Sequence, residues 1–92
     1  MNPEALSQIV KRLGLNAPDM KGDSQFHIAA LNRSVGKLSQ AIAQLEAGAT
    51  EVAVKSSATQ HCGASILVLF SLIENLGLNL EAAIAAGEQE LE

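Results

Sequence analysis

The sequence predicts an all-α protein, and two observations carry that prediction. Apolar residues recur at alternating spacings of three and four over two long stretches, as they do on the buried face of a helix. Residues that start or stop helices stand at the ends of those stretches. Together they predict an antiparallel hairpin of two long helices with short flanking helices, which completes a four-helix bundle by dimerisation.

The first expected helix runs from Pro3 to Leu13. Asn2 can cap it, proline suits the first helical position, and Gly14 stops it. The stretch that follows, residues 15–25, is rich in Pro, Gly and Asp, and is interpreted as a loop.

The second helix is the most regular element, with Ser24 as its cap and Gly48 at its end. Its apolar residues form a seam at heptad spacing, which suits lengthwise packing against another helix. That seam consists of Ile28, Leu31, Val35, Leu38, Ile42 and Leu45. The opposite side, which can face water or a cleft, carries Arg33, Lys37, Gln40 and Gln44.

The third helix is expected from about Thr50 to Leu76, with Gly77 as its stop. It is apolar nearly all round, so it is expected to be buried nearly all round. One seam consists of Ala58, Cys62, Ser65, Leu69, Leu72 and Leu76, and a second stripe of Ile66, Phe70 and Ile73. Cys62 is interpreted as a small core residue. A strand is the alternative for residues 65–70, but the regular seam on both sides favours the helix.

Asn79 can cap a short last helix from Leu80 to about Glu90, with Leu78 packing on Ala83. The second helix meets one face of the third, and the first helix is too short to cover the rest. A second copy of the chain is therefore the expected cover, in a dimer or a dimer of dimers. The interface candidates are Ile66, Phe70 and Ile73.

The composition limits the classes of function. The 92 residues suit one domain, in which 1–23 form a short helix and loop and 24–92 the helical core. The net charge of −4 argues against binding to nucleic acid or an anionic membrane. A single cysteine, Cys62, fits the reducing cytoplasm. No signal peptide is visible, and the apolar run at 64–73 is too short to span a bilayer.

Much of the chain, about residues 26–90, resembles the MazG-like all-α nucleotide pyrophosphohydrolases. The resemblance rests on "VGKLSQAIAQLEAG", on the long apolar helix after it, and on "LIENLGLNLEAAI". In "LGLNLEAA" it includes a segment similar to that family's hinge between a long and a short helix. The resemblance implies a helical fold and, in family members, Mg²⁺ held by acidic residues of two facing helices.

This sequence departs from the family at the metal site. The two acidic motifs fall on "RSVGK" and "HCGA", and the family's hinge aspartate falls on Asn79. The five acidic positions are taken by Arg33, Ser34, Lys37, His61 and Ala64. The resemblance therefore implies the family scaffold without its metal site, and we assign no catalytic residue, metal or cofactor. The expected function is that of a non-catalytic, oligomeric interaction or scaffold module.

Two alternatives stay open. In the first, Arg33, Lys37 and His61 bind an anion or nucleotide-like small molecule in a basic cleft, since Arg33 and Lys37 share a helix face. A solvated face is the competing interpretation of those two cations. In the second alternative the protein is an enzyme of unrecognised chemistry. A protein partner other than a second copy also remains open.

Overall fold

A computed structural model describes residues 1–15, 25–48 and 52–92. Within these residues the chain forms no strand, so the all-α prediction is confirmed for them and the strand alternative at 65–70 is wrong. The helices are α1 (Pro3–Arg12), α2 (Gln25–Glu46), α3 (Val52–Asn75) and α4 (Leu80–Leu91). The expected cap at Ser24, the expected start at Thr50 and most of the expected loop lie outside the described residues.

The predicted helix ends are confirmed wherever the structure describes them. The side chain of Asn2 accepts a hydrogen bond from the Ala5 N–H at 2.8 Å, and Asn79 accepts one from the Ala82 N–H at 2.9 Å. These bonds satisfy N–H groups that have no partner within the first turn of a helix. The glycines after the first three helices have the left-handed backbone of a helix stop: Gly14 (φ 73°), Gly48 (φ 99°) and Gly77 (φ 70°).

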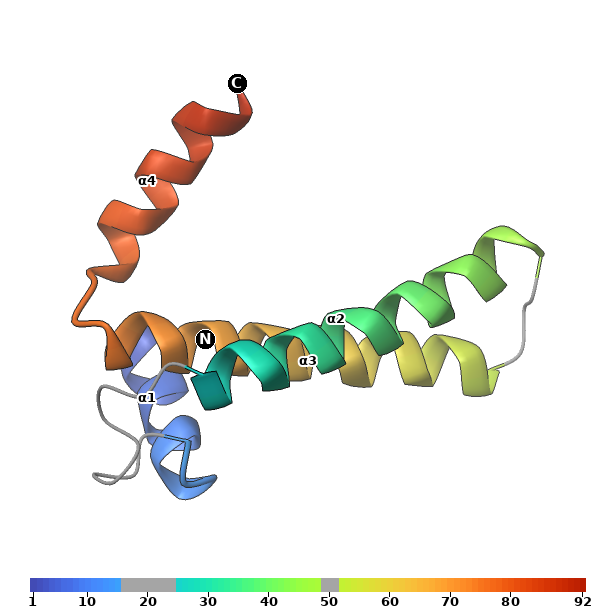
Figure 1. Ribbon diagram of the computed structural model, residues 1–92, viewed down its shortest axis with the longest axis horizontal. Helices are drawn as coiled ribbons and strands as arrows, with labels where there is room; N and C mark the ends of the chain where they lie inside the picture. The colour runs from blue at the N-terminus through green and yellow to red at the C-terminus, as the bar shows by residue number, and fades with distance from the viewer. Residues whose placement is uncertain (16–24, 49–51) are drawn as a thin grey trace.

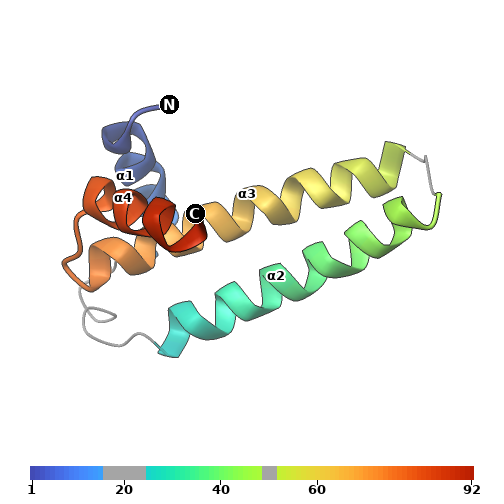
Figure 2. The same ribbon diagram turned by 90° about the horizontal axis from the view of Figure 1, so that it is seen from above.

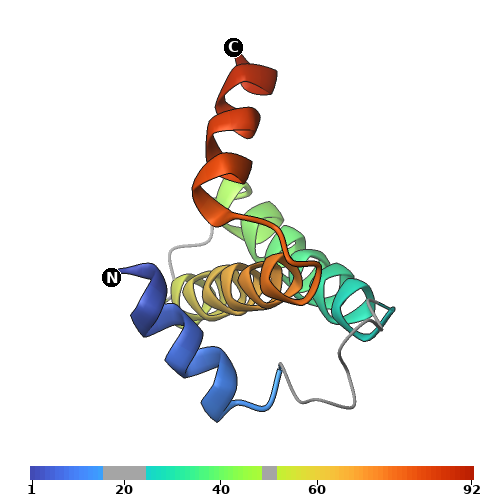
Figure 3. The same ribbon diagram turned by 90° about the vertical axis from the view of Figure 1, so that its left-hand side faces the viewer.

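The two long helices, α2 and α3, lie side by side and run in opposite directions (Figure 1, Figure 2). The C-terminal part of α3 also packs against α1, which lies at the lower left of the two long helices in Figure 3. In contrast, α4 rises from the upper side of the pair and makes at most slight contact with the other helices (Figure 1). The fold is therefore a two-helix layer with one short helix packed on it and one projecting from it.

The best-buried side chains gather where α1, α2 and α3 meet. This junction consists of Val10, His27, Phe70 and Ser71, of which Phe70 is 6% exposed and the others 0%. The Nε2 atom of His27 lies 2.9 Å from the Leu15 carbonyl oxygen and 2.8 Å from Ser71 Oγ. The Ser71 hydroxyl also reaches that carbonyl, at 3.2 Å. These bonds tie the two long helices to the end of the segment that leaves α1.

Outside the junction the molecule is open. Its radius of gyration is 14.9 Å, against about 12.3 Å for a compact domain of this length. Its accessible surface is 6528 Å², whereas a folded monomer of this mass exposes about 5,100 Å². The chain therefore keeps far more of its surface in water than a self-contained domain does.

The length of α3 bears on the question of a membrane. Within the described residues, α3 is the one helix long and apolar enough to cross a bilayer. A core helix of a soluble protein, which is mostly buried, can have the same length and composition. The N-terminal half of α3 carries Lys55, Gln60 and His61, which are costly in hydrocarbon. Length and composition therefore do not assign α3 to a membrane, and the cytoplasmic location stays a prediction.

Candidate functional site

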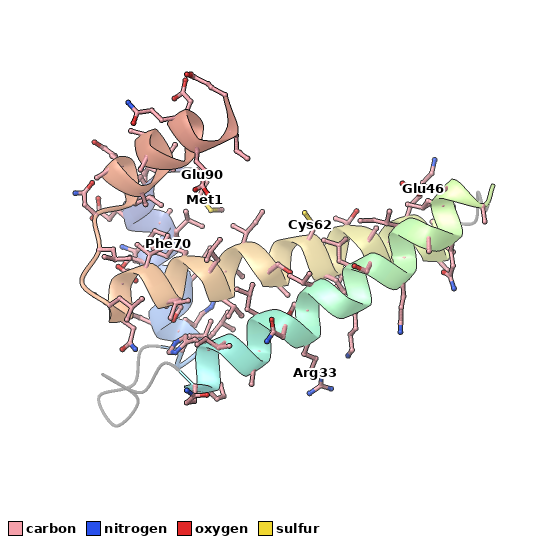
Figure 4. The ribbon with its side chains drawn as sticks, turned by 45° about the horizontal axis from the view of Figure 1, so that its top comes forward. Met1, Arg33, Glu46, Cys62, Phe70 and Glu90 are labelled. Atoms are coloured by element: carbon pink, nitrogen blue, oxygen red, sulfur yellow. The ribbon has the colours of Figure 1, made fainter. Side chains whose placement is uncertain are left out.

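The α2–α3 pair has two sides, and helix geometry decides which residues lie on each. The buried residues of each long helix mark the positions that face the other helix. They are His27 and Ala41 in α2 and Val68 in α3. The next residue along a helix lies about 100° further round. Because α2 and α3 run in opposite directions, the residue after an inward-facing one lies on the same side of the pair in both helices. Figure 4 shows Cys62 and Arg33 pointing to opposite sides.

The side that carries Cys62 is apolar and uncovered. Three of its residues follow inward-facing positions of α2 at intervals of seven, and four come from one stripe of α3 and the turn directly after it. Apart from Cys62, which is also exposed, these side chains are 42–55% exposed. We call this set the apolar face: Ile28, Val35, Ile42, Cys62, Ile66, Leu69 and Leu76.

The apolar face corrects two predictions about the seams. The predicted seam of α2 divides, because its leucines are half-buried toward α3 whereas its Ile and Val residues stay exposed. In α3, Cys62 was predicted to be a core residue and is exposed, as is Leu69 of the same seam. The physical reason is that α3 is apolar around most of its circumference, so spacing alone does not select the stripe that faces α2.

The three interface candidates occupy different environments. Ile66 belongs to the apolar face and is 55% exposed. Ile73 is half-buried, in a hollow that it shares with residues of α1 and α4. Phe70 is already buried within the chain, in the junction, so it offers little surface to a second copy. Ile66 is the candidate that the geometry supports best.

The three anion-binding candidates are not gathered into one described site. Arg33 and Lys37 are exposed, and Arg33 points away from α3 in Figure 4. Among the described residues, the hollow that Arg33 lines is bordered by α2, through Phe26, Ala29, Ala30, Arg33 and Ser34. His61 is half-buried and lies seven residues before Val68, on the line that faces α2. The geometry favours the solvated-face interpretation, and the anion site stays a prediction.

The Ser71–His27 pair has the spacing of a nucleophile and its base, but its surroundings do not suit catalysis. Both side chains are fully buried, so Ser71 Oγ presents no surface to a substrate in this structure. The carbonyl of Leu15 accepts from His27 Nε2, which therefore carries the proton and is not a base toward Ser71. Within the part of the chain that the structure describes, the Nδ1 atom has no hydrogen-bond partner to orient the ring. The pair is a structural hydrogen-bonding network.

Metal binding finds no support among the described residues, since no group of three His, Cys, Asp or Glu side chains is placed to hold an ion. The positions that correspond to the MazG-like acidic motifs are spread over exposed Arg33 and Lys37 and over half-buried Ser34, His61 and Ala64. Comparisons with protein-family models, with curated proteins and with solved structures gave no match. The MazG-like assignment therefore stays a prediction.

Two features were missed from the sequence, although both leave a signal there. His27 lies on the inward line of α2, which continues at spacings of 4, 3, 4 and 3 through Leu31, Ser34, Leu38 and Ala41. The stripe that carries the exposed residues Cys62, Ile66, Leu69 and Leu76 has the same regularity once half-buried Ile73 is included. This stripe was not recognised from the sequence, because its residues were assigned to two different expected stripes.

Proposed function

We propose that this protein is a non-catalytic interaction module that works as a homodimer. The apolar face of one copy packs on the apolar face of the second, so that α2 and α3 of both copies form a four-helix bundle. The dimer is the functional unit, and each copy provides half of the hydrophobic core. The expected MazG-like scaffold, stripped of its metal-binding carboxylates, is consistent with this architecture.

The observation that carries the proposal is the excess of accessible surface. The chain exposes 6528 Å², about 1,400 Å² more than a folded monomer of its mass. A standard protein–protein interface removes about 800 Å² from each partner. The excess is therefore larger than the area that one such interface removes from one partner.

The pattern of the exposed residues indicates a helical partner. In α2 they recur every seven residues, and those of the third helix and its last turn recur at spacings of four, three and seven. Side chains at this spacing interdigitate with those of a facing helix. A contiguous exposed patch of this kind is rare on a monomer and marks an interaction site. A second copy presents the same pattern, and a two-fold symmetric dimer would pair these two identical surfaces.

A single substitution in the apolar face tests the dimer. Light scattering on a sizing column at micromolar concentration is expected to give at least twice the chain mass of 9.6 kDa. Ile66→Asp is expected to reduce the mass to that of one chain with helicity kept, because it places a charge in the apolar interface while the residue is half-exposed in the single chain.

The matched control is Ser56→Asp, which adds the same charge to α3 at an exposed position. Ser56 precedes an inward-facing residue, so it lies on the side away from the apolar face. This variant is expected to keep the mass of the dimer. A well-folded natural chain that stays monomeric at micromolar concentration refutes the proposal.

The absence of catalysis is tested separately. Pyrophosphate release is measured with the common nucleoside triphosphates and Mg²⁺ or Mn²⁺, and no turnover is expected because Arg33 and Lys37 replace carboxylates of the resembled family. Turnover near 1 s⁻¹, at about the lower end of ordinary enzymes, would contradict the non-catalytic assignment.

A further inference from the structure

The exposed stripe of α2 has the same order of residue types from either end. Ile28, Val35 and Ile42 follow one another at intervals of seven, so Val35 lies at the centre with one isoleucine on each side. Two exposed polar residues, Asn32 and Ser39, alternate with them. An antiparallel α2 from a second copy, centred on Val35, therefore sets Ile28 of one chain against Ile42 of the other. The same alignment brings Asn32 near Ser39, so apolar side chains meet apolar ones and polar side chains meet polar ones.

The contact between the long helices places the centre of this stripe beside the middle of α3. His27 Nε2 lies 2.8 Å from Ser71 Oγ, so these two residues are at about the same level of the antiparallel pair. Val35 follows His27 by eight residues and Gly63 precedes Ser71 by eight, so Val35 and Gly63 are also level. A two-fold axis that crosses the pair at right angles at Val35 therefore crosses α3 near Gly63.

Such an axis relates two places on α3 that carry opposite charge. Lys55 precedes Gly63 by eight residues and Ile73 follows it by ten, so each lies over the other across the axis to within about half a turn. Both lie on one line of α3, because the 18 residues between them make about five turns. Lys55 is exposed. Ile73 borders a hollow between α1, α3 and α4, whose charged lining residues among those described are all acidic: Glu4, Glu74 and Glu81. We call this the acidic hollow.

The charge of the whole molecule is concentrated at the same end of the pair. The segment from Leu80 to Glu92 contains four carboxylates and no basic residue, and these account for the whole net charge of −4. In the rest of the chain the six Lys and Arg residues are balanced by six acidic ones. The segment starts where α3 ends, at the acidic hollow, whereas Lys55 lies near the start of α3 at the other end (Figure 1). Two copies with like ends together would bring these carboxylates close to one another, which is unfavourable.

We propose that the two copies pair with opposite ends together, so that α2 packs antiparallel on α2 of the second copy about Val35 and Lys55 of each copy reaches the acidic hollow of the other. The proposal rests on the dimer described above. The axis lies in the interface and crosses the helices, so α3 of one copy lies over α3 of the other, and Lys55 leans toward the edge at which the acidic hollow lies. Facing helices pack with their axes about 8–10 Å apart, which a long lysine side chain bridges.

The other two-fold arrangement through the apolar faces has its axis parallel to the helices. It sets α2 of one copy over α3 of the second at the same level, so Val35 faces the region of Cys62 and Gly63. Ile42, seven residues further along, then faces the region of Lys55, which places a cation against an apolar side chain. This arrangement also brings both acidic ends together. The pattern of the apolar face and the distribution of charge therefore favour the same pairing.

The first test uses disulfides between full chains. With Cys62→Ser as background, Val35→Cys is expected to form a covalent dimer under mild oxidation, because position 35 lies at the axis and meets itself. Ile28→Cys is the matched control, since position 28 meets position 42, and it is expected to cross-link only when Ile42→Cys is also present. In the other arrangement Val35→Cys cross-links only in chains that keep Cys62. That dependence on Cys62 overturns the proposed pairing.

The second test exchanges charges and measures the dimer by sedimentation equilibrium. Lys55→Glu is expected to raise the dissociation constant several-fold, and combining it with Glu81→Lys is expected to restore most of the loss. Lys37→Glu makes the same change on the outer side of α2 and is expected to leave the constant within about twofold of that of the natural chain. Equal effects of Lys55→Glu and Lys37→Glu overturn the contact at the acidic hollow. A stable dimer that fails these tests keeps the proposed function and excludes the pairing, whereas a monomeric natural chain overturns both.

Discussion

The junction and the apolar face are built from the same helices but have opposite exposures. At the junction, Phe70 is 6% exposed and Val10 is fully buried. One residue along from Phe70, Leu69 of the apolar face is 46% exposed. The difference is not in the residue type, since both are large and apolar. It lies in the third helix, because α1 packs on one side of α3 and no described helix packs on the other.

This difference shows what a 92-residue chain can cover by itself. The 10 residues of α1 are enough to close one end of the α2–α3 pair on one side. The apolar face runs along most of both long helices, and α4 rises from this side without lying on it (Figure 1). In the proposed dimer, a second copy packs on the apolar face in the way that α1 packs on the junction.

The largest expected difference separates Phe70→Ala from Leu69→Ala. Truncating a buried Phe loses its apolar contacts and leaves a cavity, at a cost of about 3–5 kcal/mol in the free energy of unfolding. Leu69→Ala is expected to change the stability of the single chain by less than about 1 kcal/mol and to weaken the dimer instead. Urea unfolding of protein diluted until it is monomeric measures both. Similar losses in the two variants would remove the distinction between junction and face.

A second adjacent pair sharpens the same comparison through hydrogen bonding. His27→Ala removes the donor to Leu15 and the partner of Ser71 in a fully buried site, which is expected to cost about 1–3 kcal/mol. Ile28→Ala, on the apolar face, is expected to cost under about 0.5 kcal/mol in the single chain. Thermal and urea unfolding under the same dilute conditions measure the difference. An equal cost at both positions contradicts a structural role for His27.

The smallest expected effect concerns the two asparagine caps. Replacing a capping Asn by Ala costs about 1 kcal/mol of helix stability. Asn2→Ala is expected to lower the global free energy of unfolding by that amount, because α1 belongs to the junction. Asn79→Ala is expected to reduce only the helicity of α4 in the single chain, because α4 buries no side chain there. Circular dichroism with hydrogen exchange separates the two; a global loss from Asn79→Ala would show that α4 packs on its own chain.

The helices and most of their described ends could be predicted from the sequence alone. Asn2, Asn79 and the glycines that follow the helices act on backbone groups within three or four residues, so their effect is readable without knowledge of the fold. The heptad seam of α2 likewise identified the helix that packs lengthwise, because its apolar residues occupy little more than one side. These features are local or periodic, and they survive in any tertiary arrangement.

Which surfaces of the helices are covered depends on how the helices pack together in space. This packing selects the stripe of α3 that faces α2, exposes Cys62 and Leu69, and buries the polar His27 where three segments meet. The spacing of apolar residues could not predict which stripe is buried, because a helix that is apolar nearly all round has several stripes with the same spacing. The free energy of burying one stripe differs from that of burying another only because different side chains pack against it. Those side chains come from segments that are distant along the chain, α1 foremost.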